Sequence, residues 1–144
     1  MDFGVSVKLA LARYGTIRGR SARSEFWFFI LFYVLVVSAS GIVDNIFGWT
    51  YTLGDTDPFG QLPPEAAEAE GFTGFLGSVA SLVLTLPALT LGVRRLQDTG
   101  RAAGWLLLIG IPLVGIIILI VWCCQRGTAG DNRFGPDPLL ATPT

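Results

Sequence analysis

Hydrophobic residues in this sequence gather in three long runs that contain no charged residue. The runs cover residues 26–43, 75–93 and 105–124. A helix needs about 20 apolar residues to cross the hydrocarbon core of a bilayer, and helices satisfy their own backbone groups inside lipid. The pattern therefore predicts three transmembrane helices, because 144 residues offer too little polar sequence to cover three such runs in a soluble fold.

Two of these runs allow another interpretation. The first resembles a signal peptide with small residues at Ser38 and Ser40, but its basic leader is long and the apolar run continues to residue 43. In the third run, Pro112 and Gly115 can bend the chain into a re-entrant loop, although neither arm spans a membrane alone. A continuous span is the interpretation that we carry forward for both runs.

The N-terminal segment carries a helical pattern of its own. Phe3, Val7, Leu11 and Tyr14 are spaced by four, four and three residues, which places them on one face of a helix. This spacing predicts a short basic amphipathic helix on the inner leaflet. A partly ordered tail is the alternative.

Charge asymmetry predicts the orientation. Residues 1–25 and 94–104 are rich in arginine, whereas residues 44–74 carry six acids and no basic residue. Short loops rich in lysine and arginine stay in the cytoplasm. The N-terminus and the turn at 94–104 are thus expected inside and the loop outside. Three spans place residues 125–144 outside. This tail nevertheless contains Arg126 and Arg133, so it is not depleted of basic residues as an outer segment usually is.

The prediction is thus an all-α integral membrane protein with three transmembrane helices and an N-terminal amphipathic interfacial helix, in one membrane domain. Composition agrees, since 51% of residues are hydrophobic and 15% are charged, against roughly 25% charged in soluble domains. Nucleic-acid binding is excluded, because the few basic residues lie beside apolar runs. With no histidine and only the adjacent Cys123 and Cys124, no metal site, disulfide framework or cofactor is predicted.

Three separated motifs carry a resemblance. They are IRGRSARSEFW at residues 17–27, RRLQDTGRAAGW at 94–105 and CQRGTAGDNRFGPDP at 124–138. Together they resemble the domain of unknown function 805 family of YhaH-like small bacterial inner-membrane proteins. The resemblance covers nearly the whole chain and implies a location in the bacterial inner membrane, but no reaction. One departure is Gln97, where the family usually has histidine. Glutamine does not titrate, which puts any proton or metal role there in doubt.

Two polar groups are expected at the same cytoplasmic face, one before the first span and one between the other two. Their arginines are either topology signals and interhelix clamps or a site for anionic lipid headgroups, since arginine suits bidentate phosphate contact. The candidate lipid-binding residues are Arg20, Arg23, Arg94, Arg95 and Arg101. Their candidate polar partners are Glu25, Gln97, Asp98, Asn132 and Arg133.

The function predicted from these features is structural or interactive, with membrane lipids as partners. A lipid-modifying enzyme is disfavoured, because the chain has no histidine base and no recognisable nucleophile motif. An oligomeric transporter or channel subunit is the main alternative, although no ionisable residue lies inside the predicted spans. Small residues at Gly74, Gly77, Ser78 and Ser81 allow close helix packing, so a homo-oligomer is compatible with the sequence.

Overall fold

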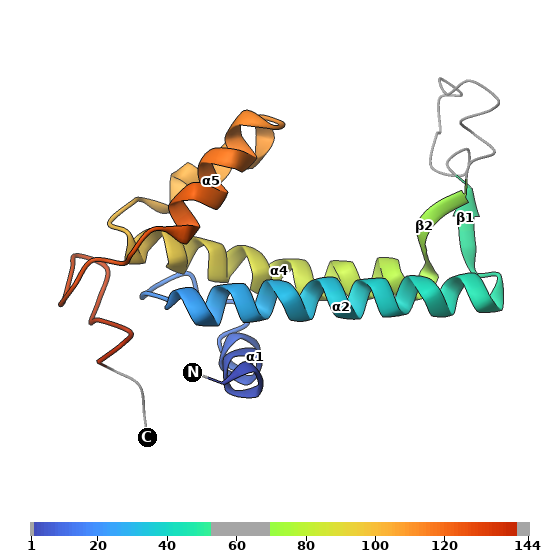
Figure 1. The fold of residues 1–144 in the computed structure, drawn as a ribbon, viewed down its shortest axis with the longest axis horizontal. Helices are drawn as coiled ribbons and strands as arrows, with labels where there is room; N and C mark the ends of the chain where they lie inside the picture. Colours follow the sequence, from blue (N-terminus) through green and yellow to red (C-terminus); the bar gives the residue numbers. More distant parts are fainter. Residues whose placement is uncertain (1, 53–69, 141–144) are drawn as a thin grey trace. The chain divides into compact units, whose positions relative to one another are not determined.

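The computed structural model describes residues 2–52 and 70–140. These residues form mainly helices, with one small antiparallel sheet (Figure 1). The elements in chain order are α1 (Phe3–Ala12), α2 (Arg23–Phe47), β1 (Thr50–Thr52), β2 (Glu70–Gly74), α4 (Phe75–Asp98), the 3-10 helix η2 (Ala103–Gly110) and α5 (Val114–Cys124). They belong to two compact units, one of Met1–Leu31 with Leu86–Thr144 and the other of Phe32–Thr85.

Two helices, α2 and α4, are long and apolar enough to cross a membrane among the residues that the structure describes. They correspond to the first two predicted spans, and both extend beyond the uncharged runs. α2 begins at Arg23, and α4 continues to Asp98, so that Arg94 and Arg95 lie within α4 near its end instead of in a connecting turn. The extension is possible because the charged side chains find partners within the fold.

The third run is not one continuous helix, so the prediction of a single helix over residues 105–124 is not confirmed. The run forms η2 and α5, separated by three residues. Pro112 has no N–H group to continue a helix. Leu113 adopts a φ of 63°, in the left-handed region where the chain direction changes. The break thus occurs at Pro112, where the alternative interpretation of a re-entrant loop placed the bend.

In the unit Phe32–Thr85, the carboxylate of Asp44 caps the first turn of α4. Asp44 is fully buried in α2 and accepts hydrogen bonds from the N–H groups of Gly74, Leu76 and Gly77 at 3.1, 2.9 and 2.7 Å. These groups have no partner inside the helix, and a negative charge is favoured at a helix N-terminus. Asp44 is therefore a structural residue within α2 and not the first residue of the acidic outer loop predicted for 44–74.

The same unit contains the sheet, in which β1 pairs antiparallel to β2 with Thr50 opposite Gly74 and Thr52 opposite Glu70. Most of the acidic residues of the predicted outer loop, from Asp55 to Glu68, lie outside the described residues.

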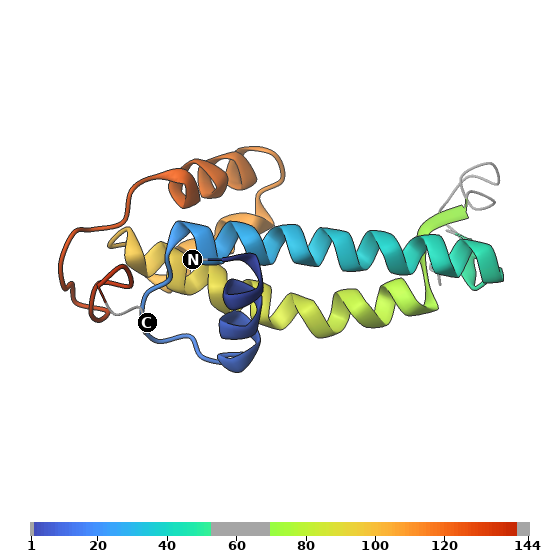
Figure 2. The ribbon, with the colours of Figure 1, turned by 60° about the horizontal axis from the view of Figure 1, so that its bottom comes forward.

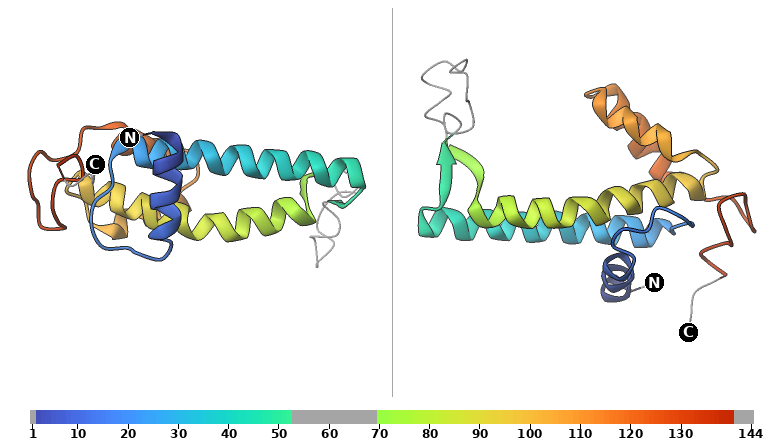
Figure 3. Two further views of the ribbon diagram at one scale, coloured as in Figure 1. Left: turned by 90° about the horizontal axis from the view of Figure 1, so that it is seen from below. Right: turned by 180° about the vertical axis from the view of Figure 1, so that it is seen from behind.

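In the other unit, α1 lies across the first turns of α2 and the last turns of α4 (Figures 2 and 3). The helix was predicted, and the face that it buries in the fold is formed by small residues outside the apolar stripe, which was predicted to lie on the membrane. α1 buries the small residues Ser6 and Ala10, whereas Phe3 and Leu11 remain more than a third exposed. Small side chains let the helix backbone approach its neighbours, which explains the choice of face.

Candidate functional site

Two arginines share the carboxylate of Asp98, the last residue of α4. The Nε atom of Arg20 lies 2.9 Å from Oδ1 of Asp98, and an Nη atom of Arg95 donates to Oδ2. All three side chains are exposed by 4% or less. Burying charges costs several kcal/mol per ion unless opposite charges and hydrogen bonds compensate. Because two positive charges face one negative charge here, neutral hydrogen-bond acceptors must supply the remaining compensation for burial of the two guanidinium groups.

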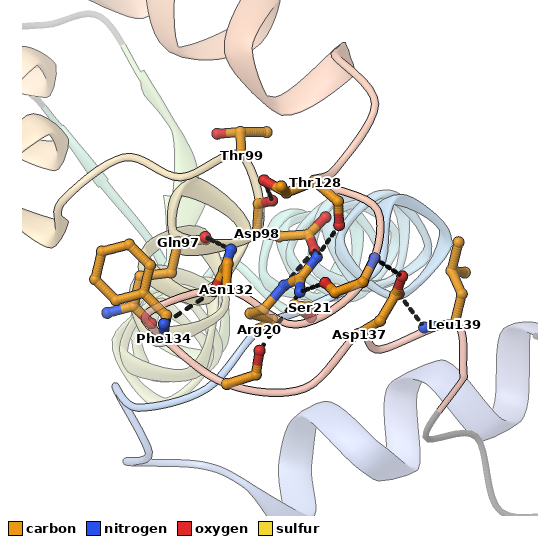
Figure 4. Close-up of polar contacts among 12 residues, drawn as sticks. Arg20, Ser21, Gln97, Asp98, Thr99, Thr128, Asn132, Phe134, Asp137 and Leu139 are labelled. Atoms are coloured by element: carbon orange, nitrogen blue, oxygen red, sulfur yellow. Dashed lines mark hydrogen bonds and ion pairs between the residues drawn. The ribbon is translucent and has the colours of Figure 1, made fainter.

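Those neutral acceptors are backbone carbonyl groups at the end of α5 and in the segment that follows it. Arg20 donates to three of them, as Figure 4 shows, and Arg95 donates to two others. The acceptors are the oxygens of Thr128, Gly130 and Gly135 for Arg20, and of Cys123 and Gln125 for Arg95. Both guanidinium groups are thereby committed to holding residues 123–130 against the end of α4.

The segment after α5 also contacts Asp98 directly. The N–H and hydroxyl groups of Thr128 both donate to the backbone oxygen of Asp98, at 2.8 and 3.1 Å. Gly127 lies so close to the Asp98 carboxylate that a Cβ atom at this position would overlap both carboxylate oxygens. A glycine at position 127 is thus required by the close approach of the backbone to the buried charge.

A second ion pair joins Arg94 of α4 to Glu25 in the first turn of α2. The closest nitrogen–oxygen distance is 3.5 Å, and both side chains are 1% exposed. The hydroxyl of Ser21 donates to the other oxygen of Glu25. The Arg94 guanidinium donates no hydrogen bond to the described residues, so this pair is held by charge and packing without the carbonyl contacts of the first. It clamps α2 to α4 at the level of the arginine motifs.

The tail beyond residue 130 folds into a turn that docks on the end of α4. The side-chain amide of Asn132 donates to the backbone oxygen of Gln97 at 3.0 Å, and Arg133 donates to that of Gly100 at 3.1 Å. The Oε1 atom of Gln97 is buried with no partner among the described residues. Gln97 therefore contributes through its backbone oxygen in the contacts that the structure describes.

Asp137 closes this turn. Its carboxylate accepts the N–H groups of Leu139 at 2.9 Å and Gly130 at 3.0 Å. The hydrogen bond from Leu139, then that from Gly130 and the charge of Arg20, lower the pKa of the Asp137 carboxyl from its usual value, against a smaller opposing effect of burial. Asp137 is thus an ionised acceptor that fixes the tail.

A pocket of about 500 Å³ lies between the N-terminus of α2 and this tail. Its walls come from the residues before and within the first turn of α2, from the end of α4 and from the tail. The lining residues are Ala22, Arg23, Ser24, Arg95, Asp98, Arg126, Gly127, Thr128, Ala129, Asp137, Pro138 and Leu139. Two of its arginines, Arg23 and Arg126, are exposed and form no ion pair with a carboxylate of the described residues. The pocket thus offers positive charge beside the N-terminus of α2.

The structure brings the two predicted polar groups together but divides their roles. Arg20 and Arg95 are bound to Asp98, Arg94 is paired with Glu25, and Arg23 is at the pocket. Arg101 lies elsewhere, with its guanidinium carbon 4.4 Å from the centre of the Trp122 ring.

Sequence reasoning did not select several residues that build this site. They are Ser21, Arg126, Gly127, Thr128 and Asp137. The glycine- and aspartate-rich motif at 124–138 was the available signal, because such residues form tight turns. It could not show which carbonyl groups the arginines would reach.

Comparison with known proteins finds a matching family and two relatives. A family described as "Protein of unknown function (DUF805)" matches residues 14–136. The chain is 38% identical over 140 residues to the Escherichia coli (strain K12) protein "Inner membrane protein YhaH", a match that covers 97% of this chain and 98% of that protein. It is 33% identical over 128 residues to "Inner membrane protein YhaI" of the same organism, covering 89% and 90%. No solved structure matches the chain significantly.

Proposed function

The chain belongs to the DUF805 family, as its motifs indicated. From this premise we propose that it is an inner-membrane protein. We further propose that it binds the phosphate of an anionic lipid headgroup at its cytoplasmic face. The two relatives are named inner membrane proteins. In the proposed orientation α2 and α4 cross the membrane, and the arginine-rich ends of both helices face the cytoplasm, as the distribution of basic residues favours. The exposed apolar face of α1 then rests on the inner leaflet.

The observation that carries the proposal is the pocket at the N-terminus of α2 with Arg23 and Arg126 in its wall. Guanidinium groups bind phosphate through paired hydrogen bonds, and helix N-termini favour anions. Arg20 and Arg95 do not take the ligand in this proposal, because their donors are occupied by Asp98 and by backbone oxygens. They act as the clamp that shapes the pocket.

Native mass spectrometry of the detergent-solubilised protein with phosphatidylglycerol or phosphatidylethanolamine tests this proposal. Arg23→Gln and Arg126→Gln should each lower retention of phosphatidylglycerol about fivefold, since one basic residue near an anionic headgroup contributes about 1 kcal/mol. Arg18→Gln is the matched control, because Arg18 is exposed and does not line the pocket. Arg23→Lys separates a pocket from surface attraction, since lysine keeps the charge but loses the paired hydrogen bonds.

Two outcomes count against the proposal. Equal losses in all three glutamine variants would show that basic charge attracts lipid evenly over the surface. Full retention in the pocket variants would show that the pocket does not bind the headgroup. Inorganic phosphate should displace the lipid from a site that recognises only the phosphate group, but not from a site that requires the whole lipid.

A further inference from the structure

The apolar segment after α4 folds back on itself. η2 and α5 pack side by side, with the rings of Trp105 and Trp122 meeting edge to face at a centroid distance of 5.5 Å. At the other end Gly115 lies against the backbone of Leu108, where a Cβ atom would overlap the carbonyl group. The two tryptophans are near the ends where the segment begins and finishes. The chain therefore enters and leaves this hairpin, residues 103–124, at the same place.

Each arm of the hairpin is too short to cross a bilayer. Eight residues of 3-10 helix and eleven residues of α-helix both give a length of roughly 16 Å, about half of the roughly 30 Å hydrocarbon core. The hairpin fits within one leaflet.

The surface of the hairpin suits lipid. Residues 103–124 include no charged side chain, and Leu107, Leu113 and Val114 are more than 60% exposed. Apolar side chains exposed together in this way mark an interaction surface. The polar features are at the base, where Arg101 lies over the Trp122 ring. Tryptophan and arginine at that level are typical of the membrane–water interface.

Four N–H groups at the tip are satisfied internally, as lipid requires of backbone groups. The N–H groups of Ile111, Val114, Gly115 and Ile117 donate to backbone oxygens within the hairpin, at 2.8 to 3.1 Å. Pro112 has no N–H group to satisfy. The connection between the arms thus needs no water for these groups.

The segment after the hairpin returns to the charges that precede it. Arg95 donates to the backbone oxygens of Cys123 and Gln125, and Thr128 donates to that of Asp98. A continuous span over residues 105–124 would place these partners on opposite sides of the membrane. The contacts therefore require Asp98 and the tail to share one side.

From these observations we infer that residues 103–124 form a re-entrant hairpin inserted into the leaflet on the side of the Arg20–Asp98 cluster, so that both chain termini face the same compartment. This inference requires a membrane location but does not depend on headgroup binding. In the orientation proposed above the leaflet is the cytoplasmic one. In this inference residues 125–144 lie on the same side of the membrane as the N-terminus, whereas three spans would place them on the opposite side.

Labelling in intact cells tests the side of the tail. In a chain carrying Cys123→Ala and Cys124→Ala, single cysteines at Arg18, Thr56 and Leu140 are treated with a membrane-impermeant maleimide before and after permeabilisation. Leu140→Cys should label in the same fraction as Arg18→Cys, and Thr56→Cys in the other. Labelling of Leu140→Cys together with Thr56→Cys, and apart from Arg18→Cys, would overturn the inference. Because the comparison is between positions, it holds for either orientation.

A matched pair of substitutions tests insertion. Leu107 in η2 and Leu140 in the tail are 83% and 81% exposed. Leu107→Asp should lower the yield of monodisperse protein from membranes severalfold, because a charge inside lipid is costly, whereas Leu140→Asp should leave it unchanged. Equal yields would show that the hairpin lies in water and would refute insertion. Lipid retention in the headgroup experiment is read separately, so failure of one proposal does not imply failure of the other.

Discussion

Arg20 and Asp98 form an ion pair with a nitrogen–oxygen distance of 2.9 Å across 78 positions of sequence. The pair joins the segment before α2 to the last residue of α4. Arg95 occupies the other oxygen of the same carboxylate. One acidic side chain thus determines how two arginine motifs and the tail assemble.

Asp98→Asn should destabilise the protein severely. The amide keeps the shape of the carboxylate but leaves two buried guanidinium groups without a counter-charge, a loss of roughly 3–5 kcal/mol for a buried pair. Thermal unfolding followed by fluorescence-detected size exclusion measures the effect. Asp2→Asn is the control, because the Asp2 side chain is exposed and does not cap α1. Similar melting temperatures for the two variants would contradict burial of the cluster.

Gly127→Ala should also lower the melting temperature. The added Cβ atom would overlap the carboxylate of Asp98, and Thr128 and Asp98 anchor the backbone on either side of the contact. Overpacking of this kind costs typically 1–3 kcal/mol. The same measurement on Gly15→Ala, where nothing lies within 4 Å of the added atom, should show little change. A neutral Gly127→Ala would mean that the tail does not approach Asp98 this closely.

Asp44→Ala should loosen the start of α4. Removing the carboxylate leaves the N–H groups of Gly74, Leu76 and Gly77 without their acceptor, and an unsatisfied buried donor costs about 1–3 kcal/mol. Hydrogen–deuterium exchange should accelerate in the peptide that contains these three amides. Asp44→Asn retains one carbonyl acceptor and should give an intermediate rate. Unchanged exchange in both variants would show that the cap does not protect the helix.

Asp137 should make tail stability depend on pH. Because its pKa is lowered in the folded chain, its charge stabilises the fold above the ordinary aspartate value of about 3.9, and this contribution is lost as the pH falls through the lowered folded value. The parent should therefore melt above Asp137→Asn at neutral pH, and the difference should shrink below about pH 4. A difference that stays constant down to pH 3 would contradict this assignment.

The membrane class of this protein, its two long helices and its family could be predicted from the sequence alone. Uncharged runs of sufficient length determine which segments prefer lipid, since transfer free energy depends mainly on the local side chains. The short N-terminal helix was predicted for a similar reason, from periodicity. The family resemblance rested on residues whose order and spacing can be read directly from the sequence.

The same local information was insufficient for the third run, for Asp44 and for the roles of the arginines. Hydropathy gives residues 105–124 the same character whether they form one helix or a hairpin, and the choice depends on Pro112, on Leu113 and on Gly115 packing against Leu108. An acidic residue at the start of a predicted loop gave no indication that three N–H groups from the end of β2 and the start of α4 would donate to Asp44.

The arginines show most clearly what could not be predicted from the sequence. The sequence predicts Arg20, Arg23, Arg94 and Arg95 at one membrane face, because charge and apolar length favour one orientation. Which guanidinium is buried and which stands at a pocket is decided by acceptors far along the chain, among them the carbonyl oxygens of Thr128 and Gly130. Carbonyl groups are the same in every residue, so sequence carries no label for them. Only the tertiary structure brings a particular carbonyl within reach of a particular arginine.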